Sequence, residues 1–524
     1  MDNTAKKIDL SQPTLHHYLV KAGVRENLDF AMGIKMNPEM TPRKWQVSGL
    51  NQALSFPRFG LYDDPGCGKT LPAQAYALYM AGYGNKVVVL MPPILLEQFE
   101  ESFLDTFPNY QDYFNLHVMD DNPAQRKKLF KKWRAHGWPD IICMSYQMFS
   151  KVPRQRKKKD GEGNVVDIIP ANPDDYISNV LADAGYKVVI ADEAQALKNP
   201  ESLTHKTLKY MIPDENDSAL LLMTGTPIPN ELTDAYGGIN LLTPGKYSSM
   251  KAFKNLHCVY NYDDDGREVL IGYQNRDMLT YAMYARARRV TKDVLKLKKP
   301  MIVQVPINLD PAHKRLYKKL IRERFLEYGD EIIIATNQQS LRQKALQIVT
   351  NPHLFSKASI KNNIIAGVHT ILDGLNMREE KVVIFANYQN SVETLVKEMT
   401  AKGYNPAVVY GGKGNNRANI RKFLNDDTCR VMVSNPRSGG VGLNLQDVCR
   451  YVIFAEPTSV PGEFKQASDR VHRSGQLLQV TFYLLKAIGT TSVKLTANML
   501  RKEGDVVGVL KDKSSILNEL MGGM

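Results

Sequence analysis

The sequence predicts an α/β protein of two lobes, each a parallel sheet flanked by helices, with a helical insertion between the lobes and helical ends. Short, continuous apolar runs fall into two groups along the chain. Runs of this length without alternation are typical of strands buried on both faces of a parallel sheet. Amphipathic stretches such as 391–402 and 416–424 lie between the runs, which indicates βαβ units. The runs are Val87–Leu90, Ile141–Met144, Val188–Ile190, Leu220–Met223, Val382–Phe385, Ala407–Tyr410, Val431–Val433 and Tyr451–Phe454.

A change of amino-acid composition between the two groups of apolar runs sets the expected domain boundaries. A chain of 524 residues is long enough for more than one domain. The stretch between the groups is rich in Lys, Arg, Tyr and Leu, and it is expected to be mainly helical. The expected segments are a helical lead-in at 1–40, a first lobe at 41–245, a helical insertion and interlobe linker at 246–375, a second lobe at 376–489 and a helical tail at 490–524.

The charge balance favours a polyanionic partner. The formal net charge is +13, and Lys and Arg gain affinity by releasing counterions from phosphates. Many basic proteins bind no nucleic acid, so charge alone leaves both interpretations open. The basic run 154–159 is followed by turn residues at 160–164, which predicts a hairpin or surface loop. That loop could contact DNA phosphate or could be a solvated tip.

Cysteine usage and hydropathy indicate a cytoplasmic protein. The cysteines are scattered and form no CxxC pair, which argues against a zinc site or a disulfide framework. No apolar run approaches the 18 residues of a membrane span, and the first residues lead into no apolar segment. We therefore expect a reducing compartment and no membrane partner.

A phosphate-binding loop is predicted at residues 63–70, Asp-Asp-Pro-Gly-Cys-Gly-Lys-Thr. An apolar approach precedes it and a helical stretch, 71–81, follows, which is the strand–loop–helix setting of a P-loop. Glycines let backbone N–H groups turn around a phosphate, the Lys69 ammonium offsets phosphate charge, and the Thr70 hydroxyl can ligate Mg²⁺. The pattern is imperfect, because Asp63 stands where glycine is usual. We expect ATP and Mg²⁺ as cofactors, held here by Asp64, Gly66, Cys67, Gly68, Lys69 and Thr70.

Two acidic residues and a hydroxyl-rich turn complete the predicted hydrolytic site. The apolar run at 188–191 ends in Asp192 and Glu193. Asp192 is expected to hold Mg²⁺ through its water shell, and Glu193 to orient and activate the attacking water. A solvated turn is the alternative for an isolated pair. The third motif, Thr224-Gly225-Thr226, follows another apolar run and can relay nucleotide state between lobes by changing hydrogen-bond partners.

Over roughly residues 40 to 495, the sequence resembles the Swi/Snf-like branch of superfamily-two helicases, which implies two RecA-like lobes. Residues 41–50 resemble the family's first motif, in which Gln46, beside Arg43, would read the adenine edge. A P-loop with a leading acidic residue is also the family's form, and 192–199 and 224–230 resemble its second and third motifs. Other helicase branches lack two further signatures that this chain resembles at 288–295 and 341–355.

The second lobe resembles the family at motifs five and six. Residues 438–445 resemble motif five, which implies that Gly442 and Asn444 lie at the nucleotide. Residues 466–476 resemble motif six, which implies that Arg470 and Arg473 reach the γ-phosphate as arginine fingers when the lobes close. Two surface arginines in a salt-bridged helix are the alternative. The residues expected to couple nucleotide state to movement are Gln195, Thr224, Gly225, Thr226, Gln466 and Asp469.

The chain departs from the family pattern at three places. Gln195 stands where the family usually has His, at the coupling contact. Ser459 stands at the position of a Trp, and Asn435 and Pro436 replace a pair of hydroxyl residues. The last two departures fall on the surface expected to face DNA.

The resemblance implies a DNA-dependent ATPase that moves on double-stranded or branched DNA by alternately gripping phosphates. We expect it to remodel replication, recombination or repair intermediates. The alternatives are a non-catalytic, nucleotide-switched DNA-binding clamp and a strand-separating DNA or RNA helicase. The short chain favours a prokaryotic or viral source, and a monomer is favoured.

Overall fold

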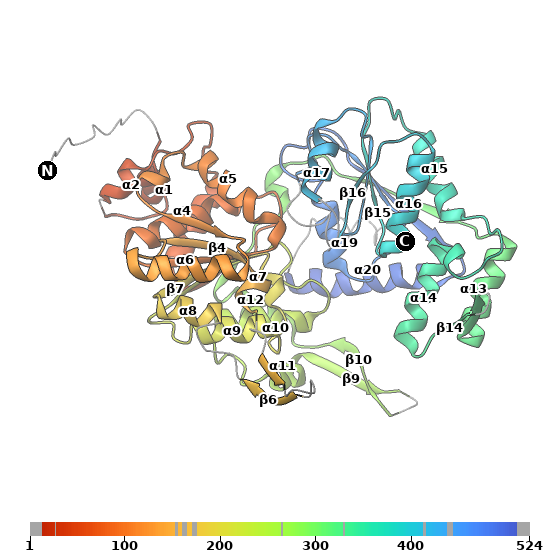
Figure 1. Cartoon of the computed structure of the whole chain (residues 1–524), viewed down its shortest axis with the longest axis horizontal. Coiled ribbons are helices and arrows are strands. Elements are labelled where there is room, and N and C mark those ends of the chain that lie inside the picture. Colours follow the sequence, from red (N-terminus) through yellow and green to blue (C-terminus); the bar gives the residue numbers. More distant parts are fainter. Residues whose placement is uncertain are drawn as a thin grey trace. The chain divides into compact units, whose positions relative to one another are not determined.

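The computed structural model describes residues 13–26, 28–151, 156–159, 165–169, 176–263, 266–328, 331–411, 416–436 and 444–510 (Figure 1). The chain divides into two compact units. The first unit holds residues 1–228 and 232–291, and the second holds 229–231 and 292–524.

The first unit is built on a seven-stranded parallel sheet, in the order β11-β1-β8-β7-β2-β4-β3. All four apolar runs predicted as strands in this half lie in its fully or almost fully buried strands. Val87 and Val89 of β2 join one hydrophobic cluster with α3, α4 and α5, and their neighbours Val88 and Leu90 point to the opposite face. The strands are β11 (Ala287–Arg288), β1 (Arg58–Leu61), β8 (Ala219–Met223), β7 (Tyr186–Asp192), β2 (Lys86–Met91), β4 (Ile141–Ser145) and β3 (Leu116–Met119).

Helices flank both faces of this sheet (Figure 1). Local capping sets the ends of α6, where the Asn122 side chain accepts from the N–H groups of Ala124 and Gln125, and Gly137 with φ 103° follows the last turn. The helices of the first unit are α1 (Leu15–Lys21), α2 (Asp29–Gly33), α3 (Lys44–Ser55), α4 (Thr70–Gly82), α5 (Leu96–Thr106), α6 (Pro123–His136), α7 (Tyr146–Phe149), α8 (Ile177–Asp183), α9 (Leu203–Met211), α10 (Ala235–Leu242), α11 (Met250–His257) and α12 (Arg276–Tyr284).

The second unit is built on a six-stranded parallel sheet, in the order β12-β19-β18-β15-β17-β16. The apolar runs predicted as strands in this half again lie in the sheet. Its strands are β12 (Met301–Ile307), β19 (Thr481–Ala487), β18 (Tyr451–Phe454), β15 (Val382–Phe385), β17 (Val431–Ser434) and β16 (Ala407–Val409). Its helices are α13 (Pro311–Glu323), α14 (Gln338–Thr350), α15 (Asn363–Asp373), α16 (Gln389–Ala401), α17 (Asn416–Asn425), α19 (Pro461–Ser468) and α20 (Thr491–Leu510). The predicted class of two parallel sheets flanked by helices is therefore confirmed.

The stretch 246–375 is less helical than its composition predicts. It contains two antiparallel hairpins, β9 (Cys258–Tyr262) with β10 (Glu268–Tyr273) and β13 (Phe325–Tyr328) with β14 (Glu331–Ile334). It also supplies β11 to the first sheet and β12 to the second. These strands lie at sheet edges or in two-stranded ribbons with solvent on their faces, so they need no continuous apolar run to mark them.

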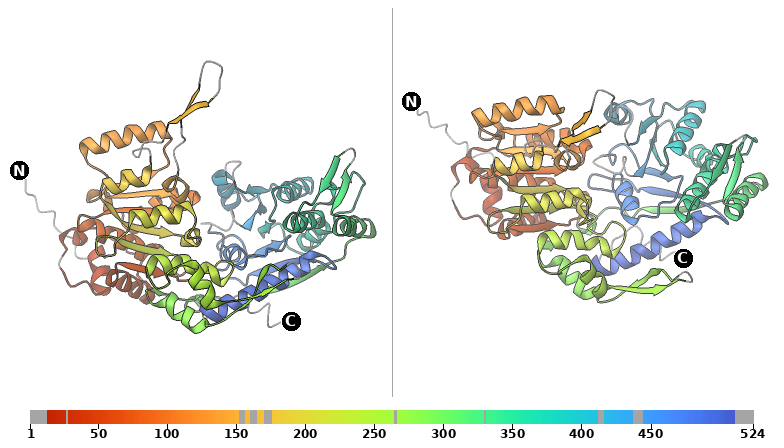
Figure 2. Two further views of the ribbon diagram at one scale, coloured as in Figure 1. Left: turned by 90° about the horizontal axis from the view of Figure 1, so that it is seen from below. Right: turned by 60° about the horizontal axis from the view of Figure 1, so that its bottom comes forward.

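The basic segment forms a hairpin, one of the two forms predicted for it. Strands β5 (Arg156–Lys159) and β6 (Val165–Ile169) pair antiparallel and form a ribbon that stands off the first sheet (Figure 2). Residues 154–155 and 160–164 lie outside the described residues. Of the helices that the structure describes, none has the length and apolar character to cross a membrane.

Candidate functional site

Three sequence motifs leave the first sheet at one edge. β1, which leads into the P-loop, pairs with β8, which leads into Thr224, and β8 pairs with β7, which ends at Asp192. Met223 pairs with both Leu61 and Asp192, so the three strands end at the same level. The carboxyl ends of parallel strands are where ligands bind in open α/β sheets, and this edge is the candidate site.

The P-loop turns tightly between β1 and α4. Gly66 and Gly68 have φ values of +86° and +81°, a left-handed conformation that glycine adopts without strain. A Cβ at Gly68 would lie 2.5 Å from the Gln46 side-chain nitrogen, so a larger residue there would displace the Gln46 amide. The Gln46 amide donates to the Gly68 carbonyl at 2.9 Å and accepts from the Arg43 N–H at 2.8 Å. Gln46 is thus brought to the loop, and Arg43 lies next to it at the start of α3.

Other contacts hold the loop from both sides. The Trp45 indole N–H donates to the Cys67 carbonyl at 2.9 Å, a contact that sequence reasoning missed. The Lys69 ammonium donates to the Asp63 carbonyl at 2.6 Å, across the turn of the loop. Gly225 lies against the opposite side, because a Cβ there would meet Pro65 Cδ at 2.3 Å. The third motif therefore contacts the P-loop directly.

The two carboxylates sit at the end of β7 in a constrained turn. Glu193 has φ 51°, in the left-handed region, and its N–H donates to Asp192 Oδ1 at 2.9 Å. The Tyr146 hydroxyl donates to the Asp192 carbonyl oxygen at 2.6 Å. Burial, with a smaller effect of both carboxylates, raises the pKa of Tyr146 well above its usual value, so this hydroxyl stays protonated. Tyr146 is a further residue that the sequence did not point to.

A chain of hydrogen bonds joins the second motif to the third. The Gln195 side-chain N–H donates to Glu193 Oε2 at 2.9 Å, and its carbonyl oxygen accepts from the Thr224 hydroxyl at 2.6 Å. Thr224 Oγ1 in turn accepts from the Thr226 N–H at 2.9 Å. An amide can donate and accept at once, so Gln195 makes a contact on each side although it departs from the family's His.

Two buried ion pairs hold the start of the P-loop to the segment at 288–292. Arg288 lies 2.7 Å from Asp63 Oδ2, and Arg289 lies 2.7 Å from Asp64 Oδ1, with no side chain of the four more than 11% exposed. The Val290 N–H also donates to Asp63 Oδ1 at 2.9 Å. Edge strand β11 runs beside β1 and aligns these partners. The leading acidic residues of the P-loop are therefore the counterions of the basic segment, whose residues the sequence singled out without a role.

In the second unit, the residues of motif six that follow α19 contact two other segments. Arg473 Nη1 donates to Asn444 Oδ1 at 2.6 Å, which joins two predicted site residues. Lys292 forms an ion pair with the buried Asp469 and donates to the His472 carbonyl at 2.6 Å. Burial, and to a lesser degree the Lys292 ammonium, lower the pKa of His472 to about 4.

The departures at 435, 436 and 459 gather around one cavity of the second unit. A space of about 340 Å³ is lined by Asn435, Pro436 and Ser459, together with Tyr388. Tyr388 and Ser459 also line a neighbouring space of about 670 Å³ against α14. With serine in place of the family's Trp, Tyr388 is the aromatic side chain that lines both spaces.

A buried carboxylate stands behind this cavity. Glu456 is 2% exposed and accepts from the hydroxyls of Thr350 and Ser391 at 2.5 and 2.6 Å. Its other oxygen accepts from the N–H groups of Asn387 and Tyr388. Burial raises the pKa of Glu456, against the effect of these hydrogen bonds.

The remaining predicted residues are placed as follows. Gly442 and most of motif five lie outside the described residues. Arg470 is buried, and its carbonyl accepts from the Leu445 N–H at 3.1 Å, while Gln466 lies in α19. Lys69 belongs to the first unit and Arg470 to the second.

The residues at the sheet edge suit a nucleoside triphosphate with Mg²⁺. Left-handed glycines turn the P-loop ahead of α4, and a lysine and a threonine follow at its first turn. The Thr70 hydroxyl and the Asp192 carboxylate are hard oxygen donors of the kind that Mg²⁺ prefers. The fold and this set of residues define a two-lobe P-loop protein of the helicase kind.

Comparison with known proteins identifies the family. The family described as SNF2-related domain matches residues 58–361, more than half of the chain, and the helicase conserved C-terminal domain matches 363–475. The chain belongs to the family of the SNF2-related domain.

The curated relatives are longer proteins. The chain is 24% identical to the ISWI chromatin-remodeling complex ATPase CHR17 of Arabidopsis thaliana, over 84% of this chain and 40% of that protein. It is also 24% identical to the ISWI chromatin-remodeling complex ATPase ISW2 of Saccharomyces cerevisiae, over 91% and 42%. The chain thus spans about two fifths of the relatives it matches. The SWI2/SNF2 ATPase core of Sulfolobus solfataricus, solved with double-stranded DNA, aligns over 92% of this chain and 98% of that one, at 20% identity and a TM-score of 0.37.

Proposed function

We propose that this chain hydrolyses ATP to move along double-stranded DNA. The observation that carries the proposal is the continuous set of contacts at one sheet edge. Gln46 and Gly225 contact the P-loop, and Gln195 links Glu193 to Thr224. A site of this kind can sense a γ-phosphate and pass the signal into the protein, because each member changes partners when its neighbour moves.

Each predicted site residue of the first unit has a proposed role that its position supports. Lys69 would offset phosphate charge, Thr70 and Asp192 would hold the metal, and Gln46 with Arg43 would face the base. When bound, MgATP supplies the bond to be broken and a cation that neutralises developing charge. Glu193, held by Gln195 at the end of β7, would orient water and take its proton.

The second unit would complete the site on closure. We propose that Arg470 and Arg473 approach the phosphates when the units close, so that hydrolysis depends on movement. The Arg473–Asn444 hydrogen bond would orient the guanidinium. The Lys292–Asp469 ion pair ties this motif to the segment that joins the units, which supports a coupling role for Asp469 and its neighbour Gln466.

The proposed partner is duplex or branched DNA, and the proposed task is remodelling of replication, recombination or repair intermediates. Family membership and the net charge of +13 support DNA binding. Two relatives carry chromatin remodelling in their names, and each is more than twice as long as the matched region. Ser459, Asn435 and Pro436 would alter how the second unit grips the backbone, because they line one cavity.

The test is ATP hydrolysis measured with and without blunt duplex DNA at one low salt concentration. Duplex should raise the rate sharply, and Lys69→Ala or Glu193→Gln should abolish hydrolysis. Arg470→Ala should lower turnover while ATP still binds. The matched control is Lys187→Ala, an exposed lysine near the start of β7, at the other end of the strand from Asp192, which should behave as wild type. A rate that duplex leaves unchanged would overturn the proposal.

Two other outcomes separate the alternatives. Nucleotide-dependent DNA binding without phosphate release would indicate a switched clamp. Displacement of a paired strand, rather than of the third strand of a triplex, would indicate a strand-separating helicase.

A further inference from the structure

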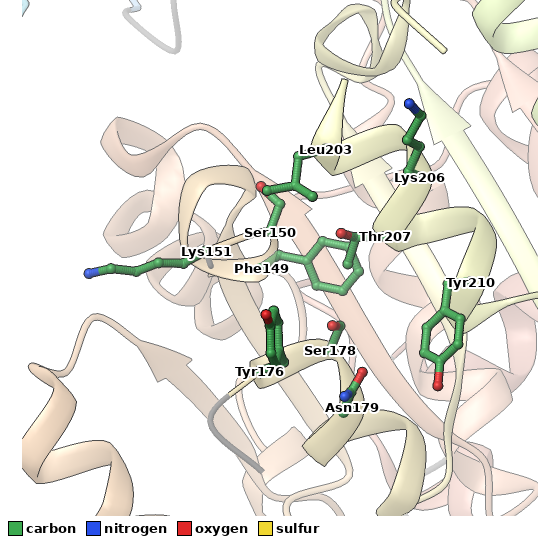
Figure 3. Close-up of a pocket in the computed structure, with 10 residues that line it drawn as sticks. All are labelled: Phe149, Ser150, Lys151, Tyr176, Ser178, Asn179, Leu203, Lys206, Thr207 and Tyr210. Carbon is green, nitrogen blue, oxygen red and sulfur yellow. The ribbon is translucent and has the colours of Figure 1, made fainter. Parts of the chain in front are cut away.

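A further cavity opens on the first unit, and none of its lining residues belongs to the predicted nucleotide motifs. It measures about 340 Å³ and lies between the end of α7, the start of α8 and the length of α9 (Figure 3). This volume is at the lower end of the roughly 300–1,000 Å³ of small-molecule sites. It suits one planar ring system with its attached group rather than a folded chain.

Aromatic rings form the walls of this cavity. Tyr176 and Tyr210 stand on two sides of it, and Phe149 lies between them at the back (Figure 3). Phe149 is 1% exposed and belongs to the core, whereas Tyr210 is 66% exposed. Within the part of the chain that the structure describes, neither tyrosine is stacked on another aromatic ring, so both rings have faces to offer a ligand.

Polar groups face the same space between the tyrosines. Ser178 and Thr207 bring hydroxyls and Asn179 brings an amide, so donors and acceptors are both present (Figure 3). Such groups can hydrogen-bond the edge of a heteroaromatic ring that stacks on one of the tyrosines. This combination of stacking faces and an amide edge is the chemistry that recognises a nucleobase.

The charges around the cavity are suited to phosphate. Its lining includes Lys151 and Lys206 and no carboxylate. Both ammonium groups extend away from the rings, in different directions (Figure 3). Lys206 pairs with Glu201 at 2.6 Å, and both side chains are more than half exposed, so this pair is weak and easily exchanged for a phosphate.

We propose that this cavity binds one unpaired nucleotide of a DNA strand, with its base against the exposed ring of Tyr210 and its phosphate at Lys206 on the same helix. A base inside a duplex cannot enter, because its faces are covered by its neighbours. The inference rests on the proposed function and deepens it. The preferred substrate is DNA with an unpaired segment, such as a fork or a gap, rather than blunt duplex.

The test is binding of a fluorescein-labelled oligodeoxythymidine of about ten nucleotides, within the usual site sizes for single strands. Tyr210→Ala should weaken binding about 5-fold to 150-fold, the range for loss of one base–aromatic stack. Tyr210→Phe keeps the ring and should bind as wild type. The matched control is Tyr262→Ala on β9, because Tyr262 is 67% exposed and lies on a different element. All measurements share one salt concentration.

A direct contact is detected by photocrosslinking. An oligonucleotide carrying 5-iododeoxyuridine should crosslink to Tyr176 or Tyr210, located by mass spectrometry. Hydrolysis stimulated by blunt duplex should be unchanged in Tyr210→Ala, which separates failure of this inference from failure of the proposed function.

Three results would overturn the inference. One is equal oligonucleotide binding by wild type and Tyr210→Ala, and another is an equal loss in Tyr262→Ala. The third is crosslinking of the iodinated oligonucleotide only at residues outside this cavity, which would place the bound strand elsewhere on the protein.

Discussion

Replacing Arg289 by methionine should destabilise the first unit and leave most of its shape intact. The Arg289 guanidinium lies 2.7 Å from Asp64 Oδ1, and the two side chains are 4% and 2% exposed. Arg289 also donates to the Tyr62 carbonyl at 2.9 Å, at the end of β1. Methionine fills a similar volume without the charge, so the main change is an uncompensated carboxylate at Asp64.

The expected cost follows from that burial. Removing one partner of a buried ion pair costs about 3–5 kcal/mol, because the remaining charge has neither water nor a counterion. A domain is stable by about 5–15 kcal/mol, so Arg289→Met should consume a large part of the stability of the first unit. The double variant Arg289→Met with Asp64→Leu removes both charges. It should lie within about 2 kcal/mol of wild type, because replacing a whole buried pair by apolar groups is often neutral.

Tryptophan fluorescence in urea measures this unit alone. The chain has 3 tryptophans, Trp45, Trp133 and Trp138, and all lie in the first unit. Trp45 contacts the P-loop through Cys67, so it also reports local loosening there. The control is Lys187→Met, because Lys187 and its partner Asp217 are 48% and 69% exposed. An exposed pair of this kind contributes about 1 kcal/mol or less.

Two results would refute this reasoning. A loss below about 1 kcal/mol in Arg289→Met would mean that Asp64 is solvated or protonated at little cost. A double variant as unstable as the single one would mean that the loss comes from packing or from the Tyr62 contact, and not from a stranded charge.

Two further predictions follow from contacts of each unit. Gln195→Ala should lower DNA-stimulated hydrolysis roughly 10-fold, because it removes both hydrogen bonds that link Glu193 to Thr224, with a combined net contribution of about 1.4 kcal/mol. Gln195→His should keep a rate close to wild type, and equal rates in all three proteins would contradict the role of this link. His472, whose pKa is lowered to about 4, stays neutral when folded while the unfolded chain takes up a proton near pH 6.5. Stability should therefore fall as the pH drops through the window from about 6.5 to 4, by about 1 kcal/mol between pH 7 and 5.5. His472→Gln should lose that much less in urea unfolding followed by circular dichroism, and an identical loss in both proteins would contradict the assignment.

The sequence predicted the central strands well and the edge strands poorly. β7 and β8 are buried throughout most of their length, and their continuous apolar runs mark them. β12 alternates between exposed and partly buried residues at the edge of the second sheet, and β11 is two residues long. Neither strand is covered on both of its faces, so neither needs a continuous apolar run in the sequence.

The motifs of the candidate site were predicted from the sequence, but the residues that contact these motifs were not. Strand, loop and helix follow one another within a few residues, so the position of Lys69 or Glu193 can be read locally. Trp45 and Tyr146 carry no such signal. Each contacts the site through a single polar atom, and its value as a donor appears only when the chain is folded.

The sequence by itself determined the two sheets, the P-loop and the acidic and hydroxyl motifs at the strand ends, because periodicity and turn chemistry are local. Only the tertiary structure decided which charges meet. Asp64 and Arg289 are 225 residues apart and become partners because β11 lies beside β1. Lys292 meets Asp469 across 177 residues in the second unit. Strand order and long-range closure are properties of the whole chain, and no short window of sequence contains them.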